Sequence, residues 1–132
     1  MALNSLSHAN LMYLQHRIDS AFEEKSQVFI LDLVEDQAQQ LGKILGIFEP
    51  SENVEMLSVV QLVHKINQAK RTQIPLFQKP TLIITCEQDG PYRAPEEWSV
   101  IEQAAKSSPC LVEFKNAGEP VVVSLFNKKG PK

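Results

Sequence analysis

The sequence predicts a three-layer α/β fold, with a mostly parallel sheet of four or five strands, helices on both faces and a C-terminal β-hairpin at one edge. Two short runs, 28–34 and 81–86, are apolar on both faces, as strands of a covered parallel sheet are. Helical spacings of apolar residues alternate with these runs, which predicts right-handed crossovers and helices on both faces. A strand–turn–strand pattern over 110–126 predicts the hairpin.

The composition is that of one globular domain. The 132 residues are 43% hydrophobic and 22% charged, which predicts a single domain over 1–126 and a flexible basic tail at 127–132. The net charge of −3 gives no general attraction to nucleic acid or to an anionic membrane. No apolar run is long enough to span a membrane, and residues 1–10 lack the pattern of a secretory signal. We therefore expect a cytoplasmic protein that binds neither membranes nor nucleic acid.

The first half of the chain predicts a helix on each side of the first buried strand. A helix over 7–24 begins at Ser7, which suits an N-cap. Its apolar stripe, at three- and four-residue steps, consists of Leu11, Leu14, Ile18, Ala21 and Phe22. After the strand, Glu35 and Asp36 stand where carboxylates favour the positive end of a helix dipole, so a second helix begins there. Its apolar spacing continues to Phe48, and Gly46 is expected near its end, as a C-terminal glycine is.

The second half continues the alternation of strands and helices. The predicted elements are a weak strand at 54–57, a helix at 58–71, a loop at 72–80, the strand at 81–86, a helix that starts at Pro95, and hairpin strands at 110–115 and 120–126. Ser58 and Gln61 form a capping box, which sets the start of the third helix. Ser108 and Pro109 end the last helix, because proline cannot continue it.

Acidic side chains follow both strongly predicted strands. Glu35 and Asp36 come after the first, and Glu87 and Asp89 after the second. Because the carboxyl ends of parallel strands meet at one edge of a sheet, these carboxylates are candidate ligands for Mg²⁺, with Glu35, Glu87 and Asp89 as the metal set. The pattern resembles a Toprim domain, which has a Glu after one strand and Asp-x-Asp after a later one, although Glu87 replaces the first Asp. Acidic helix starts explain the same residues without a metal.

Two phosphate-binding motifs are incomplete. Residues 37–44 contain Gly-Lys at the spacing of a phosphate loop, but Gln37 replaces the first glycine and Ile44 replaces the hydroxyl that holds magnesium. Residues 86–93 begin with Cys and end with Arg, as in thiol phosphatases, but six residues instead of five separate the two, and acidic residues between them disfavour an anion. An amphipathic helix and an ordinary loop explain these segments.

Two fold families show partial resemblance. Residues 109–118 are similar to the proline–strand–turn near the end of the thioredoxin fold, and the absence of CxxC implies a redox-inactive version. The element order also resembles RecA-like cores without a phosphate loop, as in SOS-type bacterial cell-division inhibitors. Glu113-x-Lys115 resembles the E-x-K of some nucleases, and it is explained equally by side-chain alternation on an edge strand.

Other reactive or charged residues are interpreted structurally. Cys86 and Cys110 are expected to be buried thiols, because both lie in apolar, strand-like surroundings. The histidines lack metal-ligand spacing and are expected at the surface; they are His8, His16 and His64. A basic face is expected to be a solvated flank; it consists of Lys65, Lys70, Arg71 and Lys79.

No catalytic constellation in the sequence is complete. We therefore expect no cofactor and a non-catalytic regulator, inhibitor or adaptor that acts through another protein or through self-association. The helix before the first strand and the hairpin edge are the expected contact surfaces, because an open strand offers unpaired backbone groups. The alternative is a Mg²⁺-dependent enzyme acting on phosphoesters or nucleic acid through Glu35, Asp36, Glu87 and Asp89.

Overall fold

The computed structural model describes residues 7–32, 35–48, 53–74, 76–85, 95–116 and 122–126. Its helices are α1 (His8–Glu23), α2 (Glu35–Ile44), α3 (Val59–Thr72) and α4 (Pro95–Lys106). Its strands are β1 (Gln27–Asp32), β2 (Val54–Ser58), β3 (Thr81–Thr85), β4 (Val112–Asn116) and β5 (Val122–Phe126). None of the described helices combines the length and the apolar character that crossing a membrane requires.

The strands form one sheet in the order β2-β1-β3-β4-β5. The first four are parallel, and β5 pairs antiparallel with β4 at the edge. Strands β1 and β3, the two strongly predicted ones, lie side by side, so that Val28 pairs with Leu82. The predicted α/β class and the hairpin edge are confirmed. The chain passes from β1 to β2 on one side and then crosses from β2 to β3 on the other side of β1, so the switch point of the sheet lies between β1 and β3.

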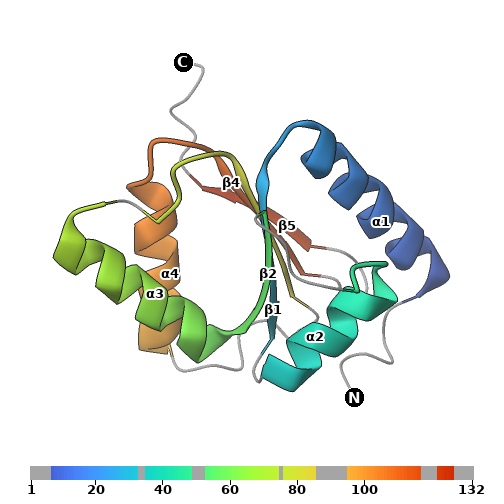
Figure 1. Ribbon diagram of the computed structural model, residues 1–132, viewed down its shortest axis with the longest axis horizontal. Helices are drawn as coiled ribbons and strands as arrows, with labels where there is room; N and C mark the ends of the chain where they lie inside the picture. The colour runs from blue at the N-terminus through green and yellow to red at the C-terminus, as the bar shows by residue number, and fades with distance from the viewer. Residues whose placement is uncertain are drawn as a thin grey trace.

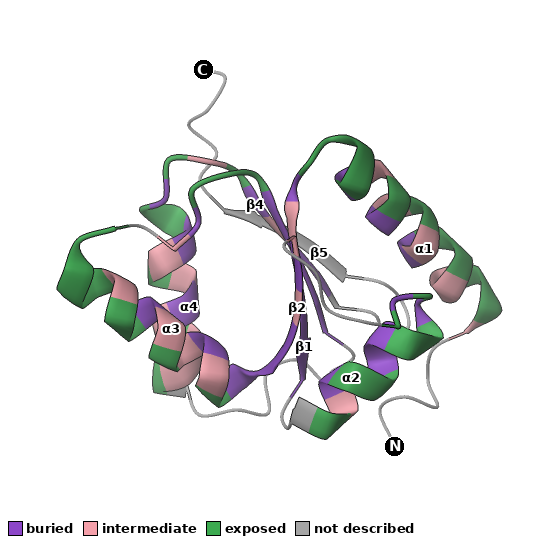
Figure 2. Cartoon of the chain, viewed as in Figure 1, coloured by how far each residue is buried: buried purple, intermediate pink, exposed green. Residues whose placement is uncertain are grey.

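The sheet is the middle of three layers (Figure 1). Helices α1 and α2 cover one face, and α3 and α4 cover the other, as right-handed crossovers in both directions from β1 require. Side chains alternate between the two cores along β1: Val28 and Ile30 pack under α1 and α2, whereas Phe29 and Leu31 pack under α3 and α4. Figure 2 shows the buried residues on the sides of the helices that face the sheet.

The predicted helix caps are present. Ser7 accepts a hydrogen bond from the Asn10 amide at 3.2 Å. The capping box at α3 is complete, since the Gln61 amide donates to the Ser58 hydroxyl and the Ser58 amide donates to the Gln61 side chain. Gln73 ends α3 in the left-handed region, with φ of 62°.

The predicted glycine at the end of α2 is confirmed, since the helix ends at Ile44 and Gly46 takes a positive φ of 96°. Phe48, which continues the apolar spacing, lies beyond the helix and is 71% exposed. Two sequence expectations are wrong in detail. Strand β4 is not an edge strand, since β3 and β5 flank it. Cys110 is only half-buried, because it lies before β4 in a turn, where its Sγ donates to the carbonyl of Gln78.

Other expectations fall outside the described residues. These are Cys86, the loop at 86–94 and the tail at 127–132. The three histidines are exposed, as predicted. The thioredoxin-like and RecA-like variants of the fold stay predictions.

Candidate functional site

The carboxyl end of the sheet holds the predicted acidic residues only in part. Asp36 is exposed on α2, and Glu35 belongs to the same helix, although its side chain is not described. Glu87 and Asp89 lie outside the described residues. In the described part of the chain, no group of three or more His, Cys, Asp or Glu side chains could hold a metal ion. The four carboxylates are therefore not brought together by any described contact.

One further carboxylate lies at this end. Asp32, the last residue of β1, is 1% exposed and pairs in register with Ser58 of β2. Asp32 lies beside the switch point, where α/β sheets bind ligands, and Ser58 lies one strand further away, on β2. Ser58, however, is occupied as the N-cap of α3. The contacts described here pair no nucleophile with a base: Ser58 caps α3, and Asp32 is a buried carboxylate at the end of β1.

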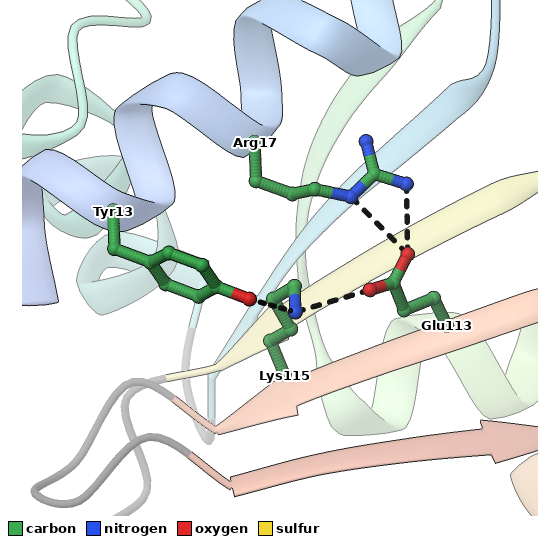
Figure 3. Close-up of polar contacts among 4 residues, drawn as sticks. All are labelled: Tyr13, Arg17, Glu113 and Lys115. Atoms are coloured by element: carbon green, nitrogen blue, oxygen red, sulfur yellow. Dashed lines mark hydrogen bonds and ion pairs between the residues drawn. The ribbon is translucent and has the colours of Figure 1, made fainter.

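A second group of polar residues joins α1 to β4 on the opposite side of the sheet from α3 and α4. We call Tyr13, Arg17, Glu113 and Lys115 the α1–β4 ion cluster (Figure 3). The Arg17 guanidinium donates to Glu113 Oε1 at 2.7 Å from Nη2 and at 3.2 Å from Nε. Lys115 Nζ lies 3.0 Å from the other oxygen, Glu113 Oε2, and donates to Tyr13 Oη at 2.8 Å. One carboxylate thus binds two cations from two elements.

Burial makes this cluster electrostatically demanding. The side chain of Lys115 is 2% exposed, that of Glu113 16% and that of Arg17 24%. Burial alone would raise the pKa of the Glu113 carboxyl, but the hydrogen bonds and charges of Arg17 and Lys115 lower it further than burial raises it. The pKa of Glu113 therefore lies below its usual value of 4.5. The carboxylate stays ionised and pairs with both cations, which fastens α1 to the sheet.

The sequence contained a signal for this cluster. Tyr13 and Arg17 are four residues apart on a helix, and Glu113 and Lys115 are two apart on a strand. Each spacing places its pair on one face of its element. The sequence did not show that β4 lies under α1, because that depends on the order of the strands in the sheet.

A groove lies between the C-terminal ends of α3 and α4. Its volume is about 220 Å³, and we call it the α3–α4 groove. Its apolar lining consists of Ile66, Ala69, Ile74, Leu76, Phe77 and Ala104. An open depression of about 530 Å³ adjoins it and shares Ala69, Ile74 and Leu76. Since α3 and α4 each run from the carboxyl end of one strand to the amino end of the next, the groove lies at the amino end of the sheet.

The predicted basic face surrounds this groove. Lys70 lines the groove itself, and Lys65 and Arg71 line the adjoining depression. Lys79 is directed elsewhere, because its Nζ donates to the Asn53 side chain at 3.0 Å. Three of the four basic residues thus border a concave surface. The interpretation of these residues as a solvated flank does not by itself explain this position.

Known proteins assign no role to either region. The chain matches no protein-family model, no curated protein and no solved structure.

Proposed function

We propose that this protein is a non-catalytic protein-binding module, a regulator, inhibitor or adaptor subunit that acts through surface contact. The observation that carries the proposal is the α3–α4 groove, a concave apolar surface left open by the fold. Ile74, at its rim, is 55% exposed although it is a large apolar side chain. Exposed apolar side chains around a concavity are typical of contact sites for other proteins.

The position of the groove favours binding over catalysis. Doubly wound sheets place their reacting groups outside the carboxyl ends of the strands, whereas this groove lies at the amino ends. Its lining contains hydroxyl, amide and ammonium groups from Ser107, Gln73 and Lys70, but no described carboxylate, histidine or thiol that could act as a base. The edge strand β5 and the exposed side of α1 remain further predicted contact surfaces.

We expect Ile74→Arg to abolish the complex that the wild-type chain forms in the cells that make it. The longer, charged side chain would occupy the mouth of the groove and leave a guanidinium desolvated against the partner. The measurement is the elution of the tagged protein from native lysate on a sizing column. Val60→Arg is the matched control, since Val60 is 59% exposed at the N-terminal end of α3, whereas Ile74 follows the C-cap at the other end. A wild-type chain that elutes at its own mass, or two variants that behave alike, would contradict the proposal.

The enzymatic alternative makes a separate prediction. If Glu35, Asp36, Glu87 and Asp89 held Mg²⁺, the ion would bind the folded state and raise the melting temperature. We expect no rise up to millimolar Mg²⁺, measured by thermal unfolding of the full chain. A rise that is lost in Glu87→Gln but kept in Glu23→Gln, at an exposed residue of α1, would replace our proposal with the enzyme.

A further inference from the structure

We infer that the α3–α4 groove binds an acidic segment of a partner protein, with an apolar side chain of that segment inserted between the two helices. This inference rests on the proposed function and adds the chemistry of the ligand. It combines the shape of the groove with the charge around it.

The floor and walls of the groove suit an aliphatic or aromatic anchor. Phe77, at its base, is 1% exposed and is held in place by an edge-to-face contact with Phe29, whose ring centroid is 6.1 Å away. Ile66 from α3 and Ala104 from α4 both line the groove. A volume of about 220 Å³ is large enough to hold one large side chain. An anchor inserted there would displace water from the apolar walls, which favours binding.

The charge around the groove has one sign. Lys70 lines the groove, Lys65 and Arg71 line the adjoining depression, and neither described lining contains Asp or Glu. Lys65 has a partial counter-charge, since its Nζ lies 3.6 Å from Glu55 Oε2. Lys70 and Arg71 are exposed, and neither makes an ion pair with any carboxylate that the structure describes. A chain whose net charge is −3 therefore presents a cationic rim at this groove, which is complementary to an acidic ligand.

The lining favours a protein segment over a nucleic acid. Bases bind to exposed aromatic faces, but the only aromatic side chain in the described lining is the buried Phe77. The depression next to the groove offers the amide group of Gln68 for backbone or carboxylate contacts. An apolar slot with a cationic margin is the arrangement that an acidic amphipathic peptide fills.

The test uses synthetic peptides and the full-length chain. The probe is a fluorescein-labelled peptide of about ten residues with leucine and phenylalanine anchors between glutamates. One control peptide has lysine at each glutamate position, and another has serine at each anchor position. We expect only the probe to bind, with amide chemical-shift changes at the C-terminal ends of α3 and α4. Binding should weaken as salt is raised, because the rim charges are exposed and are screened.

Charge reversal on the protein separates specific recognition from general attraction. We expect the double variant Lys70→Glu/Arg71→Glu to lose about tenfold in affinity for the probe. The matched variant Lys25→Glu/Lys43→Glu makes the same change in net charge at two exposed lysines in the layer of α1 and α2, and it should bind as the wild type does. Thermal unfolding of both variants verifies that they fold.

Three results would overturn the inference. The first is a probe that does not bind, or binds no better than its lysine counterpart, while Ile74→Arg still disrupts the native complex; the ligand class is then wrong and the proposed function stands. The second is equal loss of affinity in both double variants. The third is a single-stranded oligonucleotide that binds the groove and loses affinity in Lys70→Glu/Arg71→Glu, which would make the ligand a nucleic acid. If Ile74→Arg has no effect, the proposed function fails as well.

Discussion

Glu113→Gln is expected to lower the free energy of unfolding by about 3 kcal/mol, because it leaves two largely buried cations without their counter-charge. The largest part of this cost comes from Lys115, since its side chain is 2% exposed and Tyr13 Oη would be its one remaining described partner. The glutamine amide keeps the shape of the side chain, so the change isolates charge. The measurement is urea unfolding at neutral pH, and the melting temperature should fall by about 10 °C.

The pH dependence of Glu113→Gln provides an internal check. Because the pKa of Glu113 is lowered by folding, its carboxylate stabilises the protein above its usual pKa of 4.5, and this contribution is lost as the pH falls through the lower pKa of the folded state. The difference between wild type and variant should therefore shrink below about pH 4.5. Glu23→Gln, at an exposed position of α1, should show neither effect. A difference that does not change with pH would indicate lost packing instead of lost charge.

Phe77→Ala is expected to lower the free energy of unfolding by about 3–5 kcal/mol. Phe77 is 1% exposed, forms the base of the α3–α4 groove and packs against Phe29 on the central strand β1. Its removal takes away an aromatic pair and leaves a cavity that the ends of two helices cannot close. Chemical denaturation measures the loss, and Phe77→Leu should recover part of it.

Phe48→Ala is the matched control for Phe77→Ala. Phe48 is 71% exposed, so the same change of residue should alter stability by no more than about 0.5 kcal/mol. Equal effects at the two positions would show that Phe77 does not support the groove.

The architecture followed from patterns that are local in the sequence. Residues 28–34 and 81–86 could be identified as strands because a strand covered on both faces is apolar at every position, and β1 and β3 occupy the middle of the sheet. The capping box at Ser58 set the start of α3 correctly. Gly46 marked the end of α2 correctly, since a glycine after a run of helical spacing takes the positive φ that ends a helix, although the apolar spacing itself continues to Phe48.

The candidate sites depend on contacts between distant segments. The α3–α4 groove arises where two helix ends and the segment around Phe77 meet, so no short sequence pattern marks it. The basic residues Lys70 and Arg71 were visible in the sequence, but their place beside a concavity was not. The predicted acidic cluster at the carboxyl end stays a prediction, because Glu87 and Asp89 lie outside the described residues.

The fastening of α1 to β4 has a consequence for the order of folding. Arg17 and Glu113 are 96 positions apart, and Tyr13 and Lys115 are 102 apart. During synthesis, α1 can bury Leu14 and Ile18 against β1 early. Its polar residues Tyr13 and Arg17 stay solvated until β4 has been made and added to the sheet. Helix α1 is thus made before β4 but is fixed to the sheet only after β4 has formed, so a chain interrupted before residue 112 would carry a loosely attached α1.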